Sequence, residues 1–199
     1  MQARPRRSTR NAGGSVRIVA GHLRGSRLDV PDAAGLRPTS DRVRETLFNW
    51  LAPVIEGARC LDLYAGTGAL GIEAKSRGAG ECVFVERDRG LAQCLRDTLA
   101  RLKVDDARVV HADALAWLAG TPTPFDIVFL DPPFDSDLWE GSAQRLEDAG
   151  WLRPVAWIHV ESPAQVVPAV PATWHEHRVG HAGNVRHALY RRVLADPLS

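Results

Sequence analysis

The segment Asp131-Pro132-Pro133-Phe134 combines chemical features that a simple turn rarely needs. It follows the apolar run 125–130, which is typical of a buried strand, and open α/β sheets bind ligands at the carboxyl ends of their strands. The consecutive prolines remove two amide donors, so the segment offers acceptors: the Asp131 carboxylate and the Pro132 carbonyl. These acceptors can hold the N–H bonds of an amine and stabilise the positive charge that its nitrogen gains as it attacks a methyl group. Phe134 can stack on a base. We therefore predict that Asp131, Pro132, Pro133 and Phe134 form the catalytic site.

A glycine-rich turn near residue 66 follows an earlier apolar run. Gly66 and Gly68 allow close approach of a ligand to the backbone, and the next helix would direct its amide donors at that ligand. The turn alone also suits NAD, or no ligand at all. Asp62 and Glu86 favour S-adenosylmethionine, since the first can reach an ammonium group and the second can accept from both ribose hydroxyls. The residues assigned to this cofactor are Asp62, Tyr64, Ala65, Gly66, Gly68, Glu86 and Arg87.

Asp113 follows the apolar run 107–111 and has two possible roles. Its carboxylate could accept a hydrogen bond from the adenine amino group of the cofactor, or it could cap the helix that follows. We assign Asp113 and the adjacent Ala114 to the cofactor, with the helix cap as the alternative.

Short apolar runs alternate with helical stretches from residue 59 onward. Strands are expected near 60–64, 82–85, 107–111, 127–130 and 155–160, with helical spacing between them. This repeated βα order predicts an α/β fold, with a doubly wound, mostly parallel, Rossmann-like sheet. Residues 174–179 and 185–192 flank a glycine-containing turn and indicate an antiparallel hairpin at the C-terminal end of the sheet.

The N-terminal part has a different organisation. Residues 1–14 lack periodicity and are predicted to be a disordered basic arm. Residues 15–35 are predicted to form a small β-hairpin, and residues 36–195 the catalytic domain. That domain opens with a helix near Asp41, whose apolar stripe we assign to the core. The stripe consists of Val43, Leu47, Trp50 and Leu51.

The charge distribution is uneven although the net charge of the chain is only +1. The first 44 residues hold ten arginines against three aspartates, a net charge of +7, so the remainder carries −6. A basic edge on an acidic body suits a polyanion, whereas a solvated tail is the alternative. The residues predicted to contact RNA are Arg17, Arg24, Arg27, Arg37 and Arg44.

Other features exclude several classes of protein. No apolar run approaches the ~18 residues of a membrane span, and no secretory signal is present. Cys60, Cys82 and Cys94 lie in apolar stretches and are assigned to the core rather than to a disulfide or zinc site. His175 and His177 are expected to face solvent rather than to bind a metal. We expect a cytoplasmic monomer without a metal ion.

The motifs together resemble the RsmD family of bacterial 16S rRNA guanine-N2 methyltransferases. The resemblance covers residues 17 to about 192 and includes 17–21, the highly specific block 36–51, 61–71, the DPPF segment and 182–185. It implies a seven-stranded class I methyltransferase fold and a guanine of 16S rRNA as substrate, presented within a 30S subunit or an assembly intermediate. It also implies that Thr39 and Arg42 border the cofactor pocket. His187 is a departure, since the family usually has an aromatic hydroxyl there.

Three other functions share part of these signals. An adenine-N6 methyltransferase acting on DNA or RNA would use the same DPPF chemistry. A dehydrogenase would share the glycine turn but would not need the DPPF segment. A non-catalytic RNA-binding module would share the basic N-terminus, but it would not need Asp62, Glu86 and Asp131.

Overall fold

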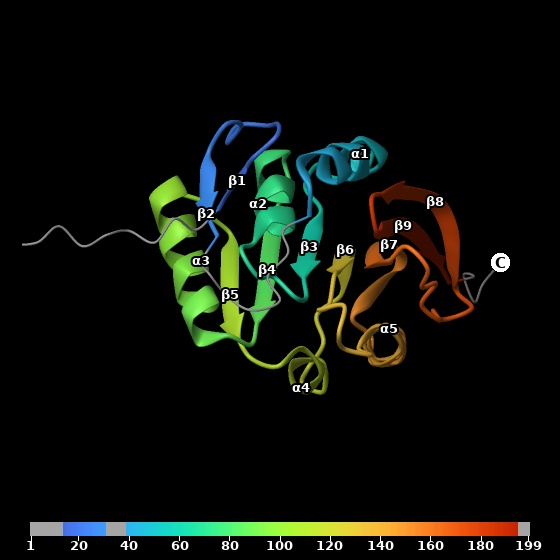
Figure 1. The fold of residues 1–199 in the computed structure, drawn as a ribbon. Helices are drawn as coiled ribbons and strands as arrows, with labels where there is room; N and C mark the ends of the chain where they lie inside the picture. The colour runs from blue at the N-terminus through green and yellow to red at the C-terminus, as the bar shows by residue number, and fades with distance from the viewer. Residues whose placement is uncertain (1–13, 31–38, 195–199) are drawn as a thin grey trace, which may run out of the picture.

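The computed structural model describes residues 14–30 and 39–194, and in them a seven-stranded sheet lies between two layers of helices (Figure 1). The strand order is β5-β4-β3-β6-β7-β9-β8; the first five strands are parallel, and β9 is antiparallel to both β7 and β8. The predicted α/β fold and its antiparallel hairpin are confirmed. The strands of this sheet are β3 (Arg59–Asp62), β4 (Glu81–Glu86), β5 (Ala107–His111), β6 (Phe125–Leu130), β7 (Leu152–Pro163), β8 (Trp174–Ala182) and β9 (Val185–Val193).

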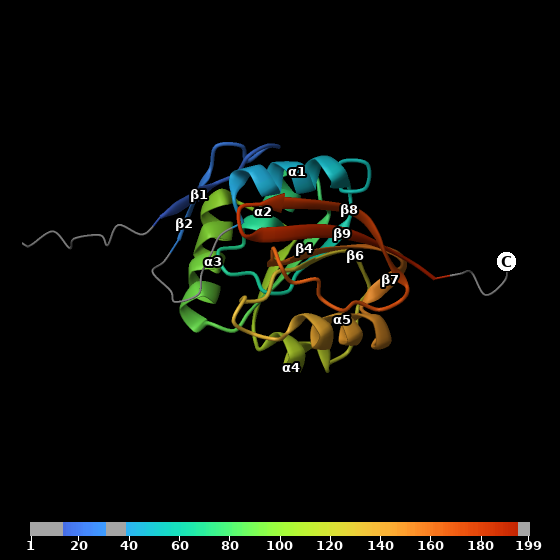
Figure 2. The same cartoon turned by 45° about the vertical axis from the view of Figure 1, so that its right-hand side comes forward.

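The helices cover both faces of the sheet, and a two-stranded hairpin of β1 (Ser15–Arg17) and β2 (Arg27–Asp29) lies beside them. In Figure 2, α1, α2 and α3 lie on one side of the sheet and α4 and α5 on the other. The helices are α1 (Asp41–Leu51), α2 (Ala69–Ser76), α3 (Arg89–Leu102), α4 (Ala114–Leu118) and α5 (Trp139–Asp148). None of the helices in the described parts of the chain is long and apolar enough to cross a membrane.

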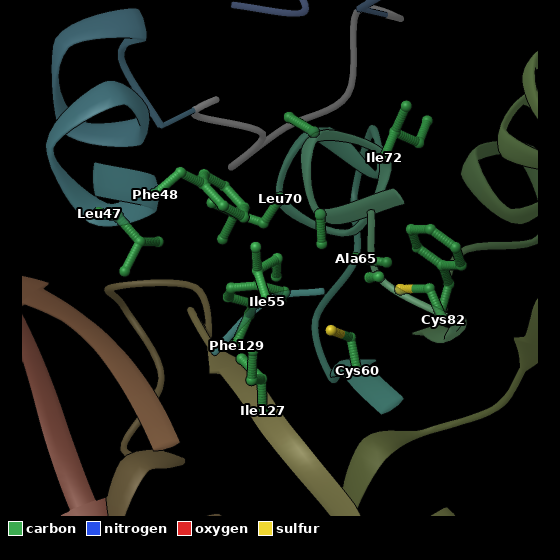
Figure 3. Packing of buried hydrophobic residues seen from close by; sticks show 14 of the residues in the cluster. Leu47, Phe48, Ile55, Cys60, Ala65, Leu70, Ile72, Cys82, Ile127 and Phe129 are labelled. Atoms are coloured by element: carbon green, nitrogen blue, oxygen red, sulfur yellow. The ribbon is translucent and has the colours of Figure 1, made fainter. Parts of the chain in front are cut away.

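Alternation along the central strands produces two separate cores. In β6, Ile127 and Phe129 face the α1–α3 side, whereas Val128 and Leu130 face α4 and α5. This is the period-two pattern of a strand that is buried on both faces. On the first side the ring centroid of Phe129 lies 5.8 Å from that of Phe48 in α1, a contact visible in Figure 3.

The first helix differs in part from its prediction. Val43, Leu47 and Leu51 are buried as expected, but Trp50 is only partly buried, and the core position belongs to Phe48. Arg44 also lies on the buried face, four residues before Phe48. The Ser40 hydroxyl accepts a hydrogen bond from the Val43 amide, which fixes the start of α1 near the predicted position.

The N-terminal hairpin is packed onto α2 rather than extending into solvent. Its side chains Ile18 and Leu28 belong to the same core as the helices α1–α3. The amides of Val19 and Ala20 donate to the carboxylate of Glu73, which is fully buried in α2. The predicted hairpin therefore exists and shares its core with the rest of the fold. The arm 1–13 lies outside the described residues.

Candidate active site

A large cavity of about 1250 Å³ opens at the carboxyl edge of the sheet. Residues at or just after the carboxyl ends of β3, β4, β5, β6 and β7 contribute to its walls, as expected for an open α/β sheet. It brings together the predicted catalytic segment and most of the predicted cofactor residues. The predicted residues that line it are Thr39, Asp62, Tyr64, Ala65, Gly66, Glu86, Arg87, Asp113, Ala114, Asp131, Pro132, Pro133 and Phe134.

Two predicted cofactor residues do not line the cavity. Gly68 has a left-handed φ of +76°, and its amide donates to the Ala65 carbonyl at 2.7 Å. A β-carbon there would lie 2.4 Å from Cδ1 of Leu95, so the turn needs glycine for its backbone shape and for packing. Arg42 is exposed on α1, outside the lining residues.

Glu86 is built into the glycine turn. Its Oε2 accepts from the amide of Gly66 at 2.8 Å, and its Oε1 accepts from the amide of Asp88 at 2.7 Å. Gly66 was predicted to allow close approach of a ligand to the backbone, and its own amide is occupied by Glu86. Each carboxylate oxygen can still accept further hydrogen bonds, because an ionised carboxylate offers about four lone-pair sites.

Asp62 is a buried carboxyl that lies between the turn and the catalytic segment. Its Oδ2 accepts from the amide of Gly71, in the first turn of α2, at 3.0 Å. Burial raises the pKa of Asp62 to about 8, against the lowering effect of the Gly71 amide; the charges of Asp131 and Glu86 raise it further. The carboxyl groups of this cavity therefore repel one another.

Asp113 forms the helix cap that was considered for it, and its predicted contact with the adenine stays a prediction. It is the N-cap of α4, where Oδ1 accepts from the amide of Ala116 at 3.0 Å. It also lines the cavity, together with Ala114. The cap uses one carboxylate oxygen, so the second oxygen can still accept a hydrogen bond.

The DPPF segment follows β6, the direct neighbour of the strand β3 that leads into the glycine turn, and it provides acceptors to the same cavity. Burial raises the pKa of Asp131 to about 7; a hydrogen bond from the nearby Thr39 hydroxyl would lower it, but in this structure the single hydroxyl proton is donated to Glu161. The Pro133 carbonyl accepts from the amide of Ser136 at 3.0 Å, whereas no donor among the described residues reaches the Pro132 carbonyl. Asp131 and Pro132 both line the cavity, so the Asp131 carboxylate and the Pro132 carbonyl are candidate acceptors there.

Phe134 is backed by an indole. Its ring centroid lies 6.1 Å from that of Trp139, the first residue of α5. Trp139 is buried and is not among the lining residues, so it supports the pocket from behind rather than forming its surface.

Glu161 is a pocket residue that the sequence reasoning missed. It lines the cavity near the end of β7, is only 4% exposed, and its Oε1 accepts from the hydroxyl of Thr39 at 2.8 Å. The available signal was its position, because it directly follows the apolar run 155–160, as Asp131 directly follows the run 125–130.

The histidines occupy three different environments. His159 is fully buried, and burial, with a smaller effect of His187, lowers its pKa to about 3. His187 is buried and stacks on Trp50, with a centroid distance of 5.1 Å and an interplanar angle of 16°. His175 and His177 are exposed, as predicted. No group of three or more potential metal ligands occurs within residues 14–30 and 39–194.

The five arginines predicted to contact RNA differ in where the structure places them. Arg17, Arg24 and Arg27 are exposed on or beside the N-terminal hairpin, which fits the expectation without testing it. Arg37 lies outside the described residues. The prediction for Arg44 is wrong, because its side chain is fully buried and donates to the Arg17 carbonyl and to Asp41, both at 2.6 Å. It ties α1 to the hairpin.

The fold and the cavity define a class I methyltransferase: a seven-stranded sheet with an antiparallel end, and a cavity lined by both a glycine turn and an acceptor-rich DPPF segment. Residues 16–191 match the family described as "Conserved hypothetical protein 95", and the chain belongs to this family, the RsmD family.

Characterised relatives and solved structures agree with this assignment. The chain is 53% identical to "Ribosomal RNA small subunit methyltransferase D" of Escherichia coli K12, over 90% of this chain and 91% of that protein. The protein of the same name from Haemophilus influenzae is 43% identical, over 92% and 97% of the two chains. The structure titled "Putative methyltransferase yhhF from Escherichia coli" superposes with a TM-score of 0.85 at 50% identity, covering 92% of this chain and 100% of that one.

Proposed function

We propose that this protein transfers a methyl group from S-adenosylmethionine to the exocyclic N2 amino group of a guanine in 16S rRNA. The observation that carries the proposal is the presence of Asp131 and the Pro132 carbonyl in the same cavity as the glycine turn and Glu86. The names of the relatives, which are small-subunit rRNA methyltransferases, support the RNA class of the substrate.

The charge of the cavity favours this cofactor over NAD. One described lining residue, Arg87, is basic, whereas seven are acidic: Asp62, Glu86, Asp88, Asp113, Asp131, Asp135 and Glu161. S-adenosylmethionine carries a sulfonium and an ammonium group, and these positive charges would favour the ionised form of Asp62, whose pKa is raised mainly by burial and further by the charges of Asp131 and Glu86. A pyrophosphate would add further negative charge to the cavity.

The donor set also fits the parts of the cofactor. Glu86 would hold the ribose hydroxyls, Asp62 the ammonium group, and Asp113 with Ala114 would border the adenine. When bound, S-adenosylmethionine supplies an electrophilic methyl group on a positively charged sulfur. The protein's own acceptors would orient the amino group of the base and stabilise the positive charge that it gains.

Asp131 and the Pro132 carbonyl would accept hydrogen bonds from the amino group of the base and orient its lone pair. A nitrogen–carbon bond then forms while the sulfur–carbon bond breaks, and the nitrogen carries a positive charge until it loses one proton to Asp131 or to water. An ionised Asp131, which is buried, would stabilise this charge as a preorganised group. Phe134 would stack on the base, which has to leave its helix or lie in a loop.

The exposed arginines of the hairpin would bind the phosphates around the target guanine. We propose that Arg17, Arg24 and Arg27 act together with the basic segment 1–14, with a 30S subunit or an assembly intermediate as the partner. A monomer that acts on 16S rRNA in this way would work in the cytoplasm. Residues 36–195 would form the catalytic domain, with the hairpin as its RNA-binding extension.

Nucleoside analysis tests the proposal. Small subunits from a strain that lacks this gene would be incubated with the purified protein and S-adenosylmethionine labelled in its methyl group, and the 16S rRNA would be digested to nucleosides. The label is expected in N2-methylguanosine. Label in N6-methyladenosine instead would support the adenine methyltransferase and overturn the proposal.

A further inference from the structure

Glu161 lies next to Asp131 at the edge of the sheet. Strands β6 and β7 are parallel, and Leu130 is paired with Val160, so Asp131 and Glu161 are the next residues along two adjacent strands. Both line the cavity, together with Phe134. Two carboxyl groups therefore lie side by side at one edge of the cavity, and one of them, Asp131, is the group proposed to hold the amino group of the base.

The position of Glu161 is held from two directions. The hydroxyl of Thr39 donates to its Oε1 at 2.8 Å, and the indole nitrogen of Trp139 donates to its backbone carbonyl at 2.7 Å. Trp139 also packs against Phe134. The same indole thus fixes the strand end that carries Glu161 and supports the ring on which the base would stack, which preorganises both groups.

A second fixed carboxylate beside Asp131 distinguishes guanine from adenine. Guanine has two adjacent donors on its Watson–Crick edge, N1–H and the N2 amino group, whereas N1 of adenine is an acceptor next to its N6 amino group. Two neighbouring carboxylates match a pair of adjacent donors. Facing adenine, one of them would oppose the lone pair of N1 and lose its hydrogen bond.

We propose that Glu161 accepts a hydrogen bond from N1–H of the target guanine while Asp131 holds the N2 amino group, so that Glu161 selects guanine. This inference rests on the proposed guanine-N2 methylation.

The experiment replaces the target guanine by 2-aminopurine, which keeps the N2 amino group but has no proton on N1. A synthetic RNA segment with either base at the mapped methylation site is ligated into 16S rRNA and assembled with small-subunit proteins. Single-turnover methylation rates are then measured for the parent, for Glu161→Gln and for Glu140→Gln. The last variant makes the same change at an exposed position of α5 outside the cavity.

The parent and Glu140→Gln are expected to methylate guanine at least ~100-fold faster than 2-aminopurine, because a buried acceptor that loses its donor strongly disfavours the analogue. Glu161→Gln can donate from its amide to the bare N1, so its preference for guanine should fall below about tenfold. Its affinity for S-adenosylmethionine and its unfolding temperature, measured in parallel, should stay close to those of the parent.

The outcomes separate this inference from the proposed function. If the parent forms no N2-methylguanosine, the proposed function is overturned. If the parent methylates guanine but accepts 2-aminopurine equally well, Glu161 does not read N1. This result is obtained with the parent protein alone, so it does not depend on whether any variant folds. Retention of the full ~100-fold preference by Glu161→Gln would likewise overturn the inference alone.

Discussion

The backbone amide of Gly66 donates a 2.8 Å hydrogen bond to Oε2 of Glu86, so the glycine turn is joined directly to the carboxylate that is proposed to hold the ribose. Because Glu86 also accepts from the amide of Asp88, its carboxylate is fixed in position. A carboxylate held in this way can accept the ribose hydroxyls without paying for its own ordering.

Replacing Glu86 by alanine should weaken binding of S-adenosylmethionine. Charge-assisted hydrogen bonds worth ~1.5 to 3 kcal/mol are lost, which corresponds to about a ten- to hundredfold higher dissociation constant by calorimetry. Glu81→Ala, at the other end of β4, is the matched control and should bind as the parent does. An unchanged affinity in Glu86→Ala would remove this residue from the cofactor site.

The pH dependence of kcat/KM for S-adenosylmethionine should reveal the raised pKa values of two carboxyl groups, Asp131 and Asp62. The pKa of Asp131 is about 7 and that of Asp62 about 8, and both groups must be deprotonated to interact with positive charge. Since protonation removes the negatively charged carboxylates, kcat/KM should rise with pH through this range and level off above it. Asp62→Asn should lose the step near 8 and keep the one near 7. A profile that stays flat between about pH 6 and about pH 9 would contradict these assignments.

The docking of the N-terminal hairpin on α2 can be tested at Gly21. Its φ is +79°, and a β-carbon would lie 1.8 Å from the backbone oxygen of Ser76. Gly25 has a similar φ of +84° but open space around it. Gly25→Ala should therefore cost only the ~1 to 2 kcal/mol of backbone strain, whereas Gly21→Ala should cost at least ~3 kcal/mol in denaturant unfolding. Equal losses in the two variants would argue against tight docking.

The exposed arginines of the hairpin should contribute to RNA binding through phosphate contacts. Reversing Arg24 and Arg27 to glutamate should weaken binding and lower the slope of log affinity against log salt by about one unit for each lost contact. Arg145→Glu, on α5 far from the hairpin, is the control (Figures 1 and 2). A salt slope identical to that of the parent would identify the basic hairpin as a solvated surface.

The strands and the main ligand segments were predictable because local patterns determine them. Runs such as 125–130 are buried on both faces and are followed directly by the residue that enters the cavity, here Asp131. Asp62 and Glu86 follow the same rule at the ends of β3 and β4. The sequence therefore predicts which residues meet at this edge once the sheet is assumed to be parallel.

Contacts between distant segments were not predictable in the same way. Arg44 was assigned to the surface because charged side chains usually face water. Its position one helical turn before Phe48 places it on the buried face, where its guanidinium donates a hydrogen bond to the Arg17 carbonyl. Glu161 depends on the pairing of β7 with β6 and on the hydroxyl of Thr39, 122 residues away. Its position after the run 155–160 marks Glu161 only as a residue at a strand end, and no local pattern contains its contact with Thr39 or the pairing of the two strands.

Asp131 is the centre of the account because its proposed role acts on the transition state. Asp131→Ala should bind S-adenosylmethionine and RNA within a few fold of the parent, since the cofactor contacts and the phosphate contacts lie elsewhere. Asp131→Asn keeps one acceptor oxygen but loses the negative charge, and its methylation rate should lie between those of Asp131→Ala and the parent.

The most direct measurement is the rate of single-turnover methylation of small subunits by Asp131→Ala, with both substrates saturating. Losing a preorganised group that stabilises charge costs ~2.7 to 4 kcal/mol, so the rate should fall at least ~100-fold while the unfolding temperature and both affinities are retained. Methylation at the parental rate would contradict the amine-activating site and reduce the DPPF segment to a structural turn.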